Sequence, residues 1–406
     1  VIIMTTRKLY LLLAFTAFIL AASYAMRAAA DGMGRPLVDS ILGPVEPPVP
    51  DVMPPGQQIE FWSNRLTPDT QDYITLTHLG RAWLGVAREP GDAAAYARAE
   101  EAVRRALALN PRYAPANALL GSTLIANHAF REAGQVAAAA LTADPHDLQA
   151  LAVSGDAALE MGDYAAADAA YSALIDNAPG GPAYSRMARL AWLNGRPDEA
   201  IDWMRRAADE AVALDIGGEE LAWYRFQLGE LYFNSGDLRS ARKWYDEAGQ
   251  AFPGYYLARA GLGKVAAARG HTDEAIDIYE GLVAQLPQPG FVAFLGDLYS
   301  LSGDDAAAQD RYDTVAFIHE LEETQQVLYN RQMAIFFANH NTNLDQALAY
   351  AQTELAGRRD IFAYDTLSWA LYRLGRYEEA RAASDRALAL NTRDATLYYH
   401  AGMIAA

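Results

Sequence analysis

The sequence of 406 residues contains no cysteine, and this excludes a disulfide framework, a thiolate metal site and a cysteine nucleophile. Basic residues are also scarce, because 33 Lys and Arg stand against 51 Asp and Glu, which gives a formal net charge of −18. Phosphate binding needs clustered Lys and Arg, so this balance argues against a nucleic-acid partner. It favours solubility and basic partners instead.

Motifs for catalysis or for metal binding are absent as well. The seven histidines are spread along the chain without the HExxH spacing of a zinc site. The segment His319–Glu323 lacks the second histidine and is interpreted as a surface helix. Neither a GxSxG nucleophile motif nor a GxxxxGK[ST] phosphate loop occurs. We therefore expect a protein that is not an enzyme and that has no cofactor and no metal.

What the chain does contain is a repeated unit, best seen in residues 360–392. Two segments of this unit, Phe362–Leu374 and Tyr377–Leu390, are apolar at helical spacing. Gly375 lies between them and can adopt the left-handed conformation that ends a helix. The pattern predicts a helical hairpin with one apolar side, which a single copy cannot bury.

A small residue opens the second helix of each copy, and successive examples are 33 to 41 residues apart. A Gly or another small residue commonly lies twelve residues before it, a larger residue four after it, and a proline twelve after it. Small residues let two helices approach closely, the larger ones fill the layer between hairpins, and proline ends the second helix. The small residues are Ala99, Ala133, Ala167, Ala200, Ala241, Ala275, Ala308, Ala347 and Ala380.

This period and pattern resemble the tetratricopeptide repeat, over about residues 69–406. The match is most regular in length at residues 112–145 and is nearest in side chains at residues 222–253. The resemblance implies an all-α fold, a right-handed superhelical solenoid of antiparallel helix pairs.

The region before the repeats divides into two parts. Residues 1–30 have a basic start, an uncharged apolar stretch and small residues, the layout of a secretory signal peptide or of an N-terminal membrane anchor. Residues 31–66 form a proline-rich spacer and lead-in, and Thr67-Pro68-Asp69 is predicted to start the first repeat helix. Both interpretations of the leader place the repeats outside the cytoplasm, with membrane contact only through residues 9–26 if the leader is uncleaved. The layout is similar to that of exported bacterial repeat proteins.

The solenoid is expected to span residues 67–406, with about nine repeats and an incomplete final one. Extra length at residues 88–95, 206–219 and 317–326 predicts longer helices or loops that change the pitch. Residues 395–406 read as the first helix of another repeat without its second helix, which we interpret as a truncation.

The resemblance also implies a concave groove lined by the first helices, and it places particular positions there. These positions are rich in aromatic side chains toward the C-terminal two-thirds of the chain, which favours peptide recognition. The implied partner-binding residues are Trp192, Trp223, Phe226, Glu230, Phe233, Asn234, Phe336, Asn339, His340, Phe362, Asp365, Trp369, Tyr372, Arg373 and Tyr399.

Two functions remain open at this point. The first is a scaffold that binds a protein or peptide segment in the aromatic groove, outside the cytoplasm. The second is an accessory module that binds saccharide or a cell-envelope polymer, because aromatic rings also stack on sugar rings. An aromatic row with neighbouring carboxylates would serve either of them.

Overall fold

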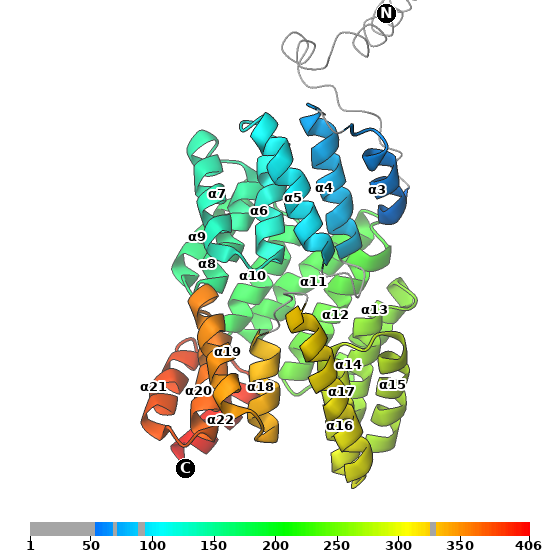
Figure 1. Cartoon of the computed structure of the whole chain (residues 1–406), viewed down its shortest axis with the longest axis vertical. Coiled ribbons are helices and arrows are strands. Elements are labelled where there is room, and N and C mark those ends of the chain that lie inside the picture. The colour runs from blue at the N-terminus through cyan, green and yellow to red at the C-terminus, as the bar shows by residue number, and fades with distance from the viewer. Residues whose placement is uncertain (1–52, 68–70, 88–93, 325–329) are drawn as a thin grey trace, which may run out of the picture. The chain divides into compact units, whose positions relative to one another are not determined.

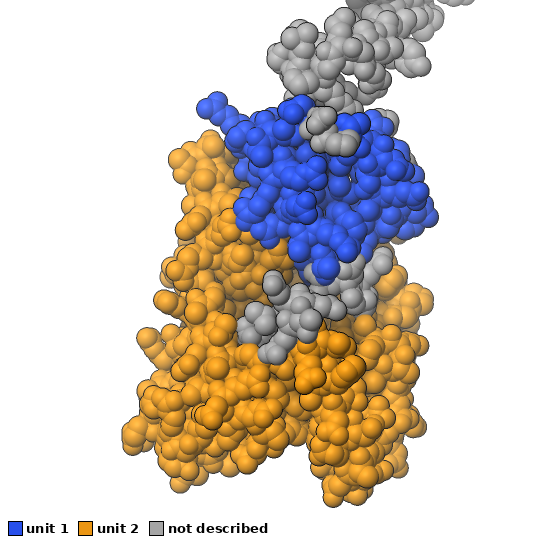
Figure 2. All heavy atoms as spheres, in the orientation of Figure 1, with its two compact units in different colours: residues 1–120 blue, residues 121–406 orange. Residues whose placement is uncertain are grey.

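The computed structural model describes residues 53–67, 71–87, 94–324 and 330–406. The expected leader, most of the proline-rich spacer and most of the insertion at residues 88–95 lie outside them. By the density of internal contacts the chain divides into two compact units, residues 1–120 and residues 121–406 (Figure 2). The boundary falls within one helix, α6 (Ala114–Ala126). The described residues contain helices and turns and no strand.

In the first unit, a short helix precedes the first hairpin. The hairpin consists of α4 (Tyr73–Ala87) and α5 (Ala94–Leu109). Helix α3 (Pro55–Ser63) was not expected, because residues 31–66 were assigned to the spacer and lead-in. It forms because a proline is tolerated in the first helical turn and because Trp62 becomes buried against α4, where it stacks on His78 with ring centroids 4.5 Å apart.

Helix α4 begins later than the sequence suggested. Thr67-Pro68-Asp69 was the predicted start, but the helix begins at Tyr73, and residues 68–70 lie outside the description. The Asp72 carboxylate accepts a hydrogen bond from the Thr75 N–H at 2.9 Å, which satisfies one of the free donors at the helix start.

The second unit continues as helical pairs, in which each helix packs chiefly against its neighbours in sequence (Figure 1). The helices after α6 are α7 (Phe130–Ala143), α8 (Leu148–Glu160), α9 (Tyr164–Asn177), α10 (Gly181–Leu193), α11 (Pro197–Ala213), α12 (Gly218–Asn234), α13 (Leu238–Ala251), α14 (Tyr256–Ala268), α15 (Thr272–Gln285), α16 (Pro289–Ser302), α17 (Asp305–Thr324), α18 (Asn330–His340), α19 (Leu344–Gly357), α20 (Ile361–Arg373), α21 (Tyr377–Ala387) and α22 (Ala395–Ala405).

The small residues at the helix crossings are buried as predicted. All nine alanines named above are at most 3% exposed. The glycines of the first helices face the large residue of the second helix: a Cβ added to Gly263 would lie 2.5 Å from the Tyr279 ring, and one added to Gly296 would lie 2.5 Å from Tyr312. The pairs that carry this glycine therefore pack their two helices closely.

The turns and the extra lengths follow the expectation with one correction. Gly375 has φ of 76°, the left-handed conformation that was predicted. Helix α21 ends at Ala387 and not at Leu390, because Leu388 and Leu390 pack instead against an apolar cluster from α8, α9 and α10. The inserted residues at 206–219 lengthen α11 and α12 to 17 residues each.

The last helices of the second unit return to its first helices. Figure 1 shows α19 and α20 beside α8 and α9. Leu159, Leu190 and Leu193 share a buried cluster with Ile361 and Leu397. The packing path therefore runs from α8 through α17, continues from α16 to α18, and comes back from α20–α22 to α8–α10. The array of the second unit is closed on itself.

Candidate binding cavity

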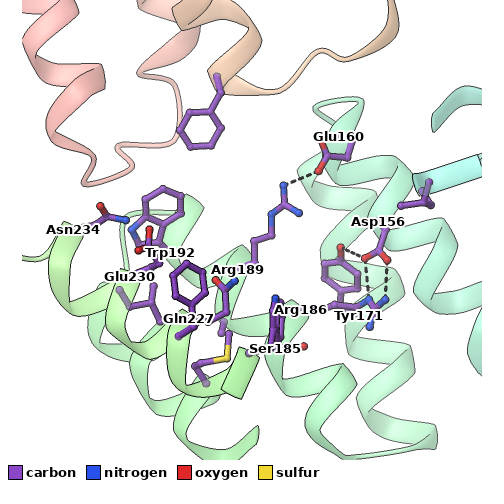
Figure 3. Close-up of a pocket in the computed structure, with 17 residues that line it drawn as sticks. Asp156, Glu160, Tyr171, Ser185, Arg186, Arg189, Trp192, Gln227, Glu230 and Asn234 are labelled. Carbon is purple, nitrogen blue, oxygen red and sulfur yellow. Dashed lines mark hydrogen bonds and ion pairs between the residues drawn. The ribbon is translucent and has the colours of Figure 1, made fainter. Parts of the chain in front are cut away.

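A cavity of about 570 Å³ opens on the inner side of the second unit (Figure 3). Most of its lining comes from the first helices of consecutive pairs, α6, α8, α10 and α12. Tyr171 of α9, Met204 of α11 and Phe362 of α20 complete it. Because second helices cover the outer side of each pair, the cavity occupies the concave surface of the solenoid. This is the place that the repeat pattern implied for a groove.

Aromatic side chains form one wall. Trp192 of α10 and Phe362 of α20 stack with ring centroids 5.9 Å apart. Trp223 is 38% exposed although it is a large aromatic residue, and Phe226 lies one helical turn further along α12. Rigid rings of this kind supply contact area at low entropic cost.

The opposite wall carries paired charges. The Asp156 carboxylate receives two hydrogen bonds from Arg186, at 2.9 and 2.8 Å, and one from the Tyr171 hydroxyl at 2.8 Å. Burial, together with the Asp156 charge, raises the pKa of the Tyr171 hydroxyl well above its ordinary value, so Tyr171 is a neutral donor. Bidentate pairing fixes Arg186 across the two repeats.

A second carboxylate of α8 is shared by two arginines. Glu160 is 7% exposed and lies 2.6 Å from Arg189 of α10 and 2.6 Å from Arg358, the residue that follows α19. Its charge is therefore compensated from two directions, as a buried charge requires.

The floor along α12 is polar. Glu230 accepts hydrogen bonds from Lys264, at 2.7 and 2.8 Å, and from the Tyr245 hydroxyl at 2.5 Å. Among the described residues, the side-chain amides of Gln227 and Asn234 make no hydrogen bond to the protein. These two amides are free to bind a partner.

The structure brings together six of the fifteen implied residues. Phe233 is close by on α12, but it packs under Lys264, whose Nζ lies 5.0 Å from the ring centroid. The residues that line the cavity are Trp192, Trp223, Phe226, Glu230, Asn234 and Phe362.

The other eight lie elsewhere, on α18, α20 and α22. Phe336, Asp365 and Trp369 are 9%, 5% and 3% exposed, so the exposed position expected for them is wrong. Trp369 stacks on His400, with ring centroids 4.2 Å apart, and its indole N–H donates to Asn339 at 2.8 Å. Close winding between repeats thus buries these rings. The remaining residues around this packing are His340, Tyr372, Arg373 and Tyr399, of which Tyr399 is 59% exposed.

A buried acid–base pair joins two of these helices. Asp365 of α20 lies 3.0 Å from the His400 ring of α22. Burial raises the pKa of the Asp365 carboxyl, and the hydrogen bond from His400 opposes that rise. The pair fixes the last helix to its neighbour.

Sequence reasoning did not assign the charged wall. Asp156 and Glu160 lie four residues apart on α8, and their partners Arg186 and Arg189 lie three apart on α10. The separations of 30 and 29 residues are close to one repeat. Acidic residues on one first helix and basic residues at matching positions of the next first helix were the sequence signal for these two ion pairs.

Within the described part of the chain, no group of three His, Cys, Asp or Glu side chains could hold a metal ion. Nor does any described helix combine the length and apolar character of a membrane span. His319 is buried, with its ring nitrogen 2.7 Å from the Tyr350 hydroxyl. The next two residues of α17, Glu320 and Leu321, are exposed, as expected for a surface helix.

Comparison with known proteins supports the repeat assignment. Four models described as tetratricopeptide repeat match residues 154–181, 182–252, 232–298 and 363–394. A search of curated protein sequences gives no match.

Solved structures resemble this one in fold. The human IFIT1 dimer with PPP-AAAA is 14% identical, with a TM-score of 0.54, over 83% of this chain and 77% of that one. The Cut9–Hcn1 hetero-tetramer of APC/C is 14% identical, with a TM-score of 0.46, over 85% of this chain and 58% of that one. TTC0263, a TPR protein of Thermus thermophilus, is 19% identical, with a TM-score of 0.41, over 48% of this chain and 99% of that one.

The helical pairs, the small residues at their crossings and the matched repeat models point to one family. Such repeats generally serve as scaffolds for contact between proteins. The chain belongs to the tetratricopeptide repeat proteins.

Proposed function

We propose that this protein is a non-catalytic scaffold that binds a peptide or protein segment in the cavity of the second unit. One observation carries the proposal: partly exposed aromatic rings and uncommitted amides line the same concave cavity. Trp223 offers a face for an apolar side chain, and Gln227 and Asn234 offer donors and acceptors for a backbone. A chain segment combines these two requirements.

The charges of the cavity favour a protein over a nucleic acid. Three carboxylates, Asp156, Glu160 and Glu230, line it together with two guanidinium groups, Arg186 and Arg189. Both guanidinium groups are paired with these carboxylates. A phosphate backbone would need unpaired cations. The formal net charge of −18 supports the same proposal.

The same proposal places the protein outside the cytoplasm. It rests on the sequence of residues 1–30, which lie outside the described residues. Fractionation of expressing cells, with mass spectrometry of the mature N-terminus, tests this part. Recovery in the cytoplasmic fraction with residues 4–30 retained would contradict it.

The binding site is tested with Trp223→Ala. Peptides selected from a displayed random library against the full chain supply a ligand whose affinity calorimetry then measures. Because Trp223 is a partly exposed aromatic anchor, its loss should weaken binding by about 2 kcal/mol or more. Helicity and melting temperature should stay near those of the parent.

The matched control is Phe317→Ala, which removes an aromatic ring that is 60% exposed on α17. It should leave the affinity unchanged. Equal affinities for the parent and Trp223→Ala would contradict the site. Binding of a glycan on an array by the parent, with no peptide selected, would favour the saccharide module instead.

A further inference from the structure

The cavity has one wall that its own repeats do not supply. Trp192 stacks on Phe362, which lies on α20, and α20 belongs to the far end of the array. Phe362 can serve as a wall only while the last repeats stay docked on the first ones. The contacts that dock the last repeats on the first ones therefore decide whether the cavity is complete.

Three hydrogen bonds, each with a backbone group on at least one side, join the two ends. The Arg359 N–H donates to the Glu160 carbonyl at 2.9 Å, and the Ile361 N–H donates to the Tyr164 hydroxyl at 3.0 Å. The Thr392 hydroxyl donates to the Leu193 carbonyl, across 199 positions of sequence. These bonds join residues about 200 positions apart in sequence, so they do not belong to the stacking of neighbouring repeats.

An alternating ladder of charges crosses the same junction. Arg189 pairs with Glu160 at 2.6 Å, and Glu160 pairs with Arg358 at 2.6 Å. Arg358 then lies 3.4 Å from Glu354, Glu354 lies 3.0 Å from Arg331, and Arg331 lies 2.7 Å from Asp360. Asp360 accepts from the Ala363 N–H and so caps α20, the helix that carries Phe362.

The charged ladder also has an aromatic support. The Arg358 guanidinium lies 4.8 Å from the centroid of the Phe130 ring, at the start of α7. Arg358 therefore touches α7 and α8 of the first repeats and α19 of the last ones.

We infer that the binding site is composite, and that a clasp formed by Glu160, Tyr164, Leu193, Arg358, Ile361 and Thr392 positions Phe362 as its closing wall. The clasp holds the array closed in the absence of any partner. A segment that contacts both Trp192 and Phe362 binds the closed form better than the open one, so partner binding and clasp closure favour each other. This coupling rests on the proposed function, whereas the clasp itself does not.

The absence of cysteine makes closure directly measurable. Ser172→Cys on α9 and Ala382→Cys on α21 place two spin labels at exposed positions of the two ends. The clasp variant combines Arg358→Gln with Thr392→Val. The control variant combines Arg376→Gln with Thr353→Val, which removes an exposed ion pair and a hydroxyl that donates within α19.

Double electron–electron resonance without ligand should give one narrow distance distribution for the parent and for the control variant. The clasp variant should shift or broaden it toward longer distances. Identical distributions in the parent and the clasp variant would overturn the clasp. If the clasp variant loses helicity, Tyr164→Phe replaces it, because this change removes only one hydroxyl. A longer or broader distance distribution in Tyr164→Phe would support the clasp, and an unchanged one would overturn it.

The composite site is tested with the peptide selected above. Phe362→Ala and the clasp variant should each weaken its binding about tenfold, and the control variant should not. Loss of binding in Trp223→Ala, together with full affinity in Phe362→Ala, overturns the composite site and leaves the proposed function standing. If no peptide binds the parent, the proposed function fails. The distances between the spin labels still test the clasp in that case.

Discussion

At the residue scale, several helical pairs depend on a missing side chain. The Tyr279 ring of α15 is buried against Gly263 of α14, and its hydroxyl donates to the Ala260 carbonyl at 3.1 Å. A tyrosine can lie flat against a helix backbone only where no Cβ intervenes. The Leu-Gly pattern in the sequence records this packing.

The closeness of this contact predicts whether a substitution at a helix glycine lowers or raises the free energy of unfolding. Gly263→Ala places a Cβ 2.5 Å from the Tyr279 ring, and overpacking of this kind costs about 1–3 kcal/mol. Gly249→Ala on α13 meets nothing within 4 Å, and Ala has the higher helix propensity, so it should stabilise by about 0.5–1 kcal/mol. Urea unfolding measures the change in the free energy of unfolding for both variants. Equal changes in Gly263→Ala and Gly249→Ala would contradict the packing argument.

At the element scale, helix starts explain part of the acidic composition. Asp147, Asp163 and Asp237 each accept a hydrogen bond from a backbone N–H three residues later, at the start of α8, α9 and α13. A carboxylate at this position satisfies a free donor and complements the helix dipole. Some of the net negative charge is therefore structural.

The α16–α18 contact depends on a histidine. The Nε2 atom of His340 lies 2.9 Å from the Asp297 carboxylate. The Nδ1 atom of the same ring lies 2.8 Å from the Phe336 carbonyl oxygen. Burial opposes the charged ring, but the Asp297 carboxylate and the Phe336 carbonyl outweigh it, so the pKa of His340 is raised. The pair joins α18 to α16, which is not its neighbour in sequence.

A pH dependence follows from that direction. Because the pKa is higher in the folded state, the stabilisation is complete below the unfolded value of 6.5 and is lost as pH rises through the folded pKa. Asp297 is 49% exposed, so solvent limits the effect of Asp297→Asn to about 1 kcal/mol.

Urea unfolding of the parent and Asp297→Asn at about pH 6 and about pH 9 measures this contribution, which should shrink at the higher pH. Asp313→Asn, at an exposed carboxylate of α17, should show no such change. An equal difference between parent and Asp297→Asn at both pH values would contradict the assignment.

At the scale of the whole molecule, the second unit is a closed array and not an open spiral. Its two ends meet through an apolar cluster and through the charged ladder from Arg189 to Asp360. An open solenoid is stabilised by nearest neighbours alone, whereas a closed one gains contacts between repeats remote in sequence. The closing contacts tie the stability of the last repeats to that of the first.

Removing the cation shared by Glu354 and Asp360 should be costly. Arg331→Met leaves Glu354 and Asp360, which are 13% and 4% exposed, without a shared cation, and an uncompensated buried charge costs about 3–5 kcal/mol. Arg376→Met breaks an ion pair that is exposed on both sides and should leave the free energy of unfolding near the parent value. Denaturant unfolding compares them, and a matching loss in the two variants would contradict a buried ladder.

The sequence alone determined the helical pairs, the buried small residues and the left-handed turn at Gly375. These are local features, because each depends on residues within one or two repeats. Predicting helix ends was less certain where distant packing competes, as at Leu388 and Leu390.

Only the tertiary structure decided that the array closes, that Phe362 stacks on Trp192, and that Trp369 is buried and not a groove residue. Closure depends on the curvature added up over many repeats, including the longer helices α11, α12 and α17. A small change in the rotation of each repeat would move the far end away from the start. The spacing of the repeats in the sequence does not reveal this total curvature. The curvature arises from the packing of all layers together.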